Sequence, residues 1–231
     1  MYHWAGLSLQ EGSSVIIELM IFFHDYMIVI LCLIMGFVSY IFLFVIITKN
    51  LDKYVVESHF LELVWTLLPM VILVFMAFPS LYLLYLTEDV TQASISVKVV
   101  AHQWYWEYEY DLSSSNSFDS YILNSDGVSS IIRNLDVDNR LVLPSFISSL
   151  MLIGSADVLH SWTVPILGVK VDAIPGRLNY LTVTPSTSGV FYGQCSELCG
   201  SNHSFIPIVV ERVLYPDFLS YLNSSSNYVS A

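Results

Sequence analysis

The chain has 231 residues, of which 55% are apolar and only 12% are charged, a balance that excludes an ordinary soluble globular protein. Twenty acidic residues against eight Lys and Arg leave a net charge of −12. This charge argues against nucleic acid as a partner, because phosphates are neutralised by basic side chains, and it favours a basic protein partner instead. The length predicts one compact domain with a membrane anchor.

Residues 1–26 form an N-terminal segment that lacks the basic region and the small-residue cleavage site of a secretory leader, so we expect mature sequence here. Two apolar runs follow, residues 27–48 with 22 residues and residues 63–87 with 25, and neither contains a charge. A helix needs about 20 apolar residues to cross the hydrocarbon core of a bilayer, so both runs are predicted to be transmembrane helices. Pro69 and Pro79 in the second run are tolerated in such helices.

The loop between the two runs, residues 49–62, carries Lys49 and Lys53. Basic residues in short loops mark the side of the membrane on which a protein is synthesised, so the loop is predicted to face that compartment. Both termini are then predicted to lie on the opposite side.

Residues 88–231 are predicted to form an all-β domain at the aqueous face. Residues 94–101 alternate apolar and polar residues, as a half-buried strand does. Short runs rich in β-branched residues follow at 141–143, 150–153, 178–184 and 208–213, and strands of this length and spacing indicate a β-sandwich or barrel. The Ser-rich residues 111–134 are expected to be a loop or an irregular strand pair, and the residues from 224 onward a polar tail. The region has 14 acidic and 6 basic residues, a net charge of −8.

The sharpest chemical signal is Cys195-Ser-Glu-Leu-Cys199-Gly-Ser-Asn-His203, with a solitary His160 35 residues before Cys195. Thiolates and imidazoles are ligands for copper and zinc. Two thiolates that bridge two coppers, with one imidazole on each metal, would form a symmetric pair that passes an electron with little rearrangement. A structural zinc site is the first alternative, although zinc sites usually show CxxC spacing, and buried free thiols beside satisfied histidines are the second. The pattern favours copper.

Residues 103–110 (QWYWEYEY) alternate aromatic residues in the manner of a strand, whose one face would carry Trp104, Trp106, Tyr108 and Tyr110. The residues alone favour a packed core strand, because aromatic side chains dominate core energetics. An exposed Trp flanked by acids would instead be a docking hot spot.

These motifs occur after the two apolar runs in the order AHQWYWEYEY, FDSY, DVDNRLVLP, DVLHSWTVPILGVKVDAIPGRLN and FYGQCSELCGSNHSF. In this order they closely resemble subunit II of cytochrome c oxidase in its mitochondrial form, over nearly the whole chain. The resemblance implies a two-helix transmembrane hairpin followed by an all-β cupredoxin-like Greek-key barrel. It also implies a function: the subunit accepts electrons from cytochrome c at a binuclear copper centre and passes them to the haem-bearing subunit I, supporting oxygen reduction to water and proton pumping.

The resemblance further implies roles for individual residues. The copper ligands are the side chains of His160, Cys195, Cys199 and His203 and the backbone carbonyl of Glu197, whose carboxylate reaches a magnesium ion shared with subunit I. Trp104 is the residue that first receives electrons, and Glu62 lies at the mouth of a proton pathway. Cytochrome c is expected to dock on Trp104, Tyr105, Glu109, Asp119, Asp138 and Asp157. The implied location is the mitochondrial inner membrane, with residues 49–62 as a matrix loop and with both termini and the copper domain in the intermembrane space.

One position departs from the family. The family has a methionine three residues after the second histidine ligand, as an axial copper ligand, whereas this chain has Ile206, which has no donor atom. Axial thioethers are weak and chiefly tune the reduction potential, so the rest of the centre can still form. Two hypotheses follow: Ile206 is genuine and one copper has three ligands, or the isoleucine is a translation artefact.

Two other functions predict different patterns. A membrane-anchored copper-delivery protein also uses C-x3-C with a distant histidine, but it predicts one membrane span and a thioredoxin-like αβ pattern. A quinol-oxidase subunit of the same fold would lack the cysteine and histidine ligands.

Overall fold

The computed structural model describes residues 9–49, 52, 54, 56–88, 93–111, 117–123, 132–184 and 186–228. They divide into two compact units, one of residues 19–86 and one of residues 1–18 with 87–231. Lys53, on which the predicted orientation partly depends, lies outside the described residues.

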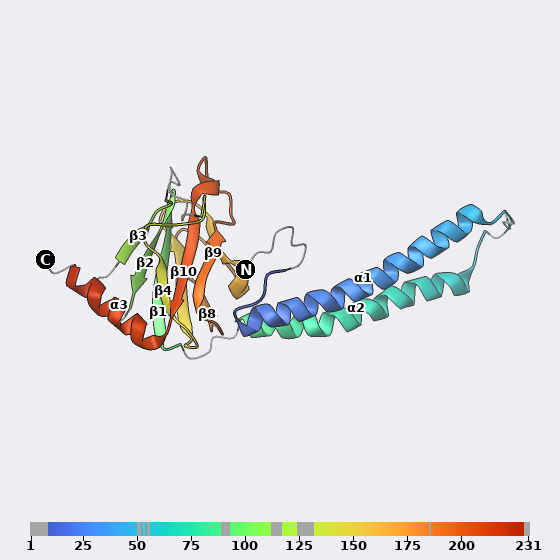
Figure 1. Ribbon diagram of the computed structural model, residues 1–231. Coiled ribbons are helices and arrows are strands. Elements are labelled where there is room, and N and C mark those ends of the chain that lie inside the picture. Colours follow the sequence, from blue (N-terminus) through green and yellow to red (C-terminus); the bar gives the residue numbers. More distant parts are fainter. Residues whose placement is uncertain are drawn as a thin grey trace. The chain divides into compact units, whose positions relative to one another are not determined.

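The first unit consists of two long apolar helices, α1 (Val15–Ile47) and α2 (His59–Glu88), which run side by side in Figure 1. Their lengths of 33 and 30 residues and their mean hydropathies of 2.9 and 2.3 are sufficient to cross a membrane. Tyr26 of α1 donates a hydrogen bond from its hydroxyl to the carbonyl oxygen of Phe75 in α2 at 3.4 Å. The two predicted apolar runs fall on these helices, but both helices begin earlier, because polar residues end an apolar run without ending a helix.

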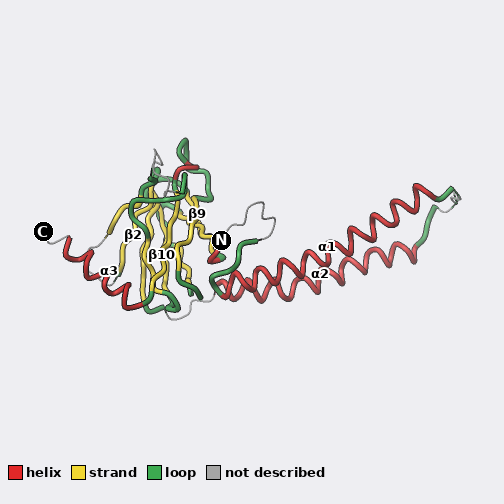
Figure 2. The backbone as a smooth tube through the Cα atoms, in the orientation of Figure 1, coloured by secondary structure: helices red, strands yellow, loops and turns green. Residues whose placement is uncertain are grey.

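The second unit is a β-sandwich built from three open sheets, shown as yellow strands in Figure 2. One sheet has the order β3-β2-β1-β5-β8, with the bounds Ser117–Ser120, Tyr105–Tyr110, Ile95–His102, Ser149–Ser155 and Asn179–Val183. A second has the order β4-β10-β9, with the bounds Leu141–Pro144, Pro207–Val213 and Gly189–Gln194. The third pairs β6 (His160–Val164) with β7 (Val169–Ala173).

The predicted all-β domain is confirmed, and each of its six predicted strands is present, including the aromatic strand expected within residues 103–110. Strands β1 and β5 are parallel neighbours, as are β4 and β10, so the chain crosses over between strands as in Greek-key sandwiches. The described strands form no closed barrel. The sequence reasoning missed four strands and a helix. Strand β3 lies in the Ser-rich stretch, β6, β7 and β9 contain the metal-binding motifs or flank them, and α3 (Tyr215–Tyr228) includes part of the expected polar tail.

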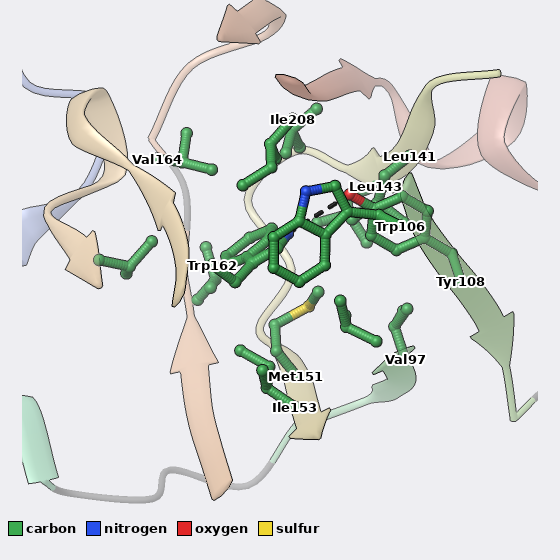
Figure 3. Close-up of a cluster of buried hydrophobic side chains, with 14 of the residues drawn as sticks. Val97, Trp106, Tyr108, Leu141, Leu143, Met151, Ile153, Trp162, Val164 and Ile208 are labelled. Carbon is green, nitrogen blue, oxygen red and sulfur yellow. Dashed lines mark hydrogen bonds between the residues drawn. The ribbon is translucent and has the colours of Figure 1, made fainter. Parts of the chain in front are cut away.

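The core lies between the sheets and is centred on large aromatic side chains (Figure 3). Trp106 and Tyr108 of β2 are fully buried there with Trp162 of β6, whose Nε1 donates to the hydroxyl of Tyr108 at 3.4 Å. Met151 is also fully buried in this cluster. Trp104 packs against this core only in part. It precedes β2 in the turn after β1 and is half-buried, so the alternation predicted from the sequence holds only from Trp106 onward.

Candidate copper centre

Two strand ends bring the distant His160 to the cysteine loop. His160 is the first residue of β6, and Cys195 directly follows the last residue of β9. The two strands approach closely at Gly193, where an added Cβ would lie 1.9 Å from the carbonyl oxygen of Thr163. Ser196 donates its backbone N–H to the carbonyl of Ser161 at 3.1 Å and holds the loop beside β6. A residue with a side chain at Gly193 would separate these strands.

The loop after Cys195 folds back on itself. The backbone N–H of Cys195 donates to the carbonyl oxygen of Ile206 at 3.1 Å, which closes the loop at its base. A short 3-10 turn, His203–Phe205, begins with a hydrogen bond from the His203 N–H to Gly200 at 3.3 Å. This turn places the imidazole of His203 beside the thiol of Cys199.

Each cysteine sulfur has its own imidazole partner. The two sulfur atoms of Cys195 and Cys199 are 4.0 Å apart. Nδ1 of His160 lies 3.8 Å from the Cys195 sulfur, and Nδ1 of His203 lies 3.4 Å from the Cys199 sulfur. His160 has no exposed surface, and the two cysteines are 7% and 4% exposed. Two soft thiols and two imidazoles in a shielded site fit copper, and they bring together the four side chains expected from the sequence.

Asp157 lies behind the first histidine. Its Oδ1 accepts a hydrogen bond from Nε2 of His160 at 2.9 Å, which leaves Nδ1 directed at Cys195. Burial lowers the pKa of His160, but the hydrogen bonds to Cys195 and Asp157 outweigh burial and raise it. Burial also raises the pKa of Asp157, and the bonds from His160, Val158 and Gln103 reverse this and lower it.

The two thiols differ in acidity. Burial opposes ionisation of Cys195, yet its hydrogen bond with His160 lowers the pKa of this thiol. Burial and the neighbouring Cys195 sulfur both raise the pKa of the Cys199 thiol. Cys195 is therefore the thiol that ionises first, and a cation between the two sulfurs would favour the ionisation of both.

The turn between β1 and β2 covers the loop. Gln103 donates from Nε2 to the carbonyl oxygen of Cys199 at 2.8 Å. The indole of Trp104 lies against Gly200, and its buried Nε1 has no hydrogen-bond partner among the described residues. Gln103 and Gly200 were missed from the sequence. Only the φ of +125° at Gly200 requires glycine, and a lone glycine in a loop does not reveal this.

Three of the residues expected to dock cytochrome c gather around Tyr121. Tyr105 stacks on Tyr121 with ring centroids 4.5 Å apart. Asp138 accepts the Tyr121 backbone N–H at 2.8 Å, and Asp119 lies 3.4 Å from its hydroxyl. Glu109 is half-buried further along β2 and is paired with Lys98 at 3.0 Å.

His102 and Glu107 extend this acidic face. The His102 ring stacks on Tyr105 with centroids 4.6 Å apart, and its Nε2 lies 3.2 Å from the Glu107 carboxylate. Glu107 also faces Asp119 across the β2–β3 pair. The sequence reasoning named neither Glu107 nor Tyr121, because cross-strand contacts depend on register.

Three further expected residues are placed as follows. The carbonyl oxygen of Glu197 accepts the Cys195 thiol at 3.4 Å, and its side chain is exposed. Ile206 is 2% exposed beneath the loop. Glu62 lies exposed in the first turn of α2, in the other compact unit.

The chain has two helices long enough to span a membrane and a β-sandwich that brings two thiols and two imidazoles together. These features define a membrane-anchored, cupredoxin-like copper protein. Residues 2–83 match the family described as "Cytochrome C oxidase subunit II, transmembrane domain", and residues 95–213 match "Cytochrome C oxidase subunit II, periplasmic domain". The chain belongs to the cytochrome c oxidase subunit II family. It is therefore a subunit of an oxidoreductase of the respiratory chain, with a copper site at the His160 and cysteine cluster.

Similar proteins agree with this assignment. Cytochrome c oxidase subunit 2 of Drosophila ambigua is 45% identical over 98% of this chain and 100% of its own length. The Periplaneta americana protein is 45% identical over 96% of this chain and 98% of its own. The crystal structure of the periplasmic domain of subunit II (CoxB) of Bradyrhizobium japonicum is 38% identical, with a TM-score of 0.57, covering 61% of this chain and 99% of that one.

A second solved structure is the mixed disulfide intermediate between a thioredoxin-like protein and a cytochrome c oxidase subunit II. It is 37% identical, with a TM-score of 0.54, and covers 61% of this chain and 96% of that one. The copper-delivery alternative required one span and an αβ pattern, and it is wrong for a chain with two apolar helices and an all-β domain.

Proposed function

We propose that this subunit receives electrons from cytochrome c near Trp104 and passes them through a binuclear copper centre to subunit I. The observation that carries the proposal is the paired arrangement of two sulfur atoms 4.0 Å apart, each with its own imidazole nitrogen. In this proposal the thiolates of Cys195 and Cys199 and the imidazoles of His160 and His203 would hold the coppers, with the backbone carbonyl of Glu197 as a weaker ligand. When bound, the copper pair supplies one-electron redox chemistry.

The protein keeps the centre rigid and dry. The burial of His160, Cys195 and Cys199 excludes water, and hydrogen bonds fix the ligand-bearing loop at both ends. Because ligands held in this way do not move when the charge of the centre changes, the reorganisation energy of electron transfer stays small. The half-buried Trp104 packs against the loop next to Cys199, which makes its indole the aromatic group expected to link the surface to the centre.

Docking in this proposal uses the acidic face of Tyr105, Glu109, Asp119, Asp138 and Asp157. The negative charge of the whole chain supports a basic partner such as cytochrome c, because opposite fields steer association and raise its rate. The pairing of Glu109 with Lys98 reduces its contribution, and Asp157 is engaged with His160 and Gln103. Asp119 and Asp138 then carry most of the steering.

Magnesium and the membrane arrangement belong to the same proposal. The exposed carboxylate of Glu197 is available to a magnesium ion shared with subunit I, while its backbone carbonyl faces Cys195. The protein is placed in the mitochondrial inner membrane, spanning it with residues 27–48 and 63–87. The loop with Lys49 faces the matrix, near the proton-pathway residue Glu62, and both termini and the copper domain lie in the intermembrane space.

The decisive experiment is copper loading of the full chain in detergent, followed by metal analysis and electron paramagnetic resonance. Two coppers per chain and a mixed-valence spectrum shared between both nuclei are expected. One copper per chain, a single-copper spectrum, or preferential uptake of zinc would remove the basis of the proposal.

A further inference from the structure

Gln103 makes two hydrogen bonds that end on different ligand-bearing segments of the copper centre. Its side-chain Nε2 donates to the carbonyl oxygen of Cys199 at 2.8 Å, and its backbone N–H donates to Oδ2 of Asp157 at 2.6 Å. The other oxygen of Asp157 accepts from His160 at 2.9 Å. Gln103 therefore touches Cys199 directly and reaches His160 through one carboxylate.

Gly200 shows how tightly the loop packs against Gln103 and its neighbour. A Cβ added at Gly200 would lie 3.2 Å from Nε2 of Gln103 and 3.2 Å from Cζ2 of Trp104. Carbon atoms in ordinary contact are about 3.5–4.0 Å apart, so a side chain at Gly200 would force the Gln103 amide and the Trp104 indole to move by a few tenths of an ångström. The amide of Gln103 and the indole of Trp104 thus lie directly against the peptide that follows Cys199.

From these contacts we infer that Gln103 is a positioning residue for electron transfer. Its side-chain amide fixes the Cys199–Gly200 peptide against Trp104. Because the carbonyl that it holds belongs to Cys199, the hydrogen bond also restrains the residue that carries the sulfur. Outer hydrogen bonds of this kind orient metal ligands and tune the metal. Because the Gln103 side chain is also exposed, a docked protein that contacts it acts on the copper loop through a single hydrogen bond.

The inference rests on the proposed function, and it is tested in the intact oxidase with the substitution Gln103→Met, which keeps the length of the side chain and removes the donor. The copper content is expected to stay at the wild-type value, while the copper hyperfine pattern and the reduction potential change. We expect kcat to fall about tenfold with KM for cytochrome c unchanged. A small ruthenium ammine reductant, which needs no protein docking surface, should show the same loss.

The matched control is Asn179→Leu. Asn179 also donates from its side-chain amide to a backbone carbonyl, that of Asp172, at 2.6 Å, but it does not contact the loop. This variant should leave the spectrum, the potential and kcat unchanged. Gln103→Lys restores an N–H donor and should recover the wild-type spectrum.

Two results would overturn the inference. In the first, Gln103→Met keeps the wild-type spectrum and potential and changes only KM, which would make Gln103 a contact residue for cytochrome c alone. In the second, the spectrum of Gln103→Lys differs from the wild-type spectrum as much as that of Gln103→Met, which would show that the hydrogen-bond donor at residue 103 does not determine the spectrum. Failure of the proposed function is separate, because it would appear as the absence of a two-copper spectrum in the wild-type protein.

Discussion

Nε2 of the buried His160 lies 2.9 Å from Oδ1 of Asp157, and this one hydrogen bond fixes which ring nitrogen faces the sulfur of Cys195. With the proton on Nε2, the lone pair of Nδ1 is free for a metal. The sequence resemblance assigned Asp157 to the docking surface, and that assignment stays a prediction. Its contacts with His160 and with the backbone of Gln103 and Val158 indicate a role in holding a ligand as well.

Replacing Asp157 by Ala should therefore weaken copper binding. Loss of a carboxylate behind a ligating histidine typically costs 10–100-fold in metal affinity or activity, and we expect about this loss for Asp157→Ala. Chelator competition on the full chain in detergent measures it. Asp119→Asn, which removes an acid remote from the ligands, should retain wild-type copper affinity. Equal copper affinity in Asp157→Ala and the wild type would return Asp157 to the docking surface.

Asp119→Asn should instead weaken the encounter with cytochrome c. The Asp119 carboxylate is exposed, and a single exposed charge pair contributes about 0.2–1 kcal/mol, so KM is expected to rise by up to about fivefold with kcat unchanged. The difference should vanish near 1 M salt, where the screening length is about 3 Å. Asp217→Asn in the exposed first turn of α3 is the control and should not alter KM. A KM effect that persists at high salt would exclude electrostatic steering as its cause.

The sequence was sufficient to predict which four side chains come together, but not the contacts that hold them. Cysteine, histidine and their spacing are chemical signals that can be read without coordinates, and the structure brings His160, Cys195, Cys199 and His203 together as expected. Gln103 acts through contacts with Cys199 and Asp157, which are distant in the sequence, and those contacts exist only once the turn after β1, the residues before β6 and the cysteine loop are packed together. The start of α1 at Val15 was missed for a different reason. Hydropathy identifies only the apolar part of a helix, whereas the backbone hydrogen bonds of α1 continue into the more polar residues before it.

Gly193→Ala should damage the centre although Gly193 is no ligand. A Cβ there would lie 1.9 Å from the carbonyl oxygen of Thr163, so β9 must move away from β6. Overpacking of this kind costs about 1–3 kcal/mol, and the strand shift should also weaken copper binding, because Cys195 follows β9 directly. Thermal unfolding and copper titration of the full chain measure both effects. Gly154→Ala, whose Cβ would come no nearer than 3.4 Å to another group, should be close to neutral. Wild-type stability and copper affinity in Gly193→Ala would contradict this prediction.

Ile206→Met should change the spectrum of the centre with little change in stability. Ile206 is buried beneath the loop and its carbonyl accepts the Cys195 N–H, so its backbone lies beside a ligand-bearing residue. A thioether at this position is a weak axial ligand and chiefly tunes the reduction potential. The potential and hyperfine pattern should therefore shift, with two coppers still bound. Unchanged spectra would mean that residue 206 does not reach the metal.

The identity of residue 206 is settled by mass spectrometry of the peptide that contains His203. A mass that matches isoleucine eliminates the translation artefact and leaves a centre without an axial thioether. A mass that matches methionine establishes the artefact, and the naturally made protein then already corresponds to the Ile206→Met variant.

Arg212→Met should stabilise the protein. Arg212 on β10 is 2% exposed, it lies over the ring of Phe191, and its Nη1 donates to Ser13 at 3.2 Å. Its Nε and Nη2 have no hydrogen-bond partner in the part of the chain that the structure describes. Burying such groups without partners costs about 1–3 kcal/mol, and we expect a gain of this order at about pH 7 from thermal unfolding of the full chain in detergent.

The gain from Arg212→Met should depend on pH in one direction. Burial lowers the pKa of Arg212 to about 10 in the folded protein, below its value in the unfolded chain. The folded state therefore carries the cost of the charge at every pH below about 10 and loses this cost as the group gives up its proton at higher pH. The stability difference between variant and wild type should be constant near neutral pH and shrink above about pH 10. Arg177→Met removes an exposed arginine and should lie within about 0.5 kcal/mol of the wild type. A loss of stability in Arg212→Met would show that the contacts with Ser13 and Phe191 outweigh the burial of the charge.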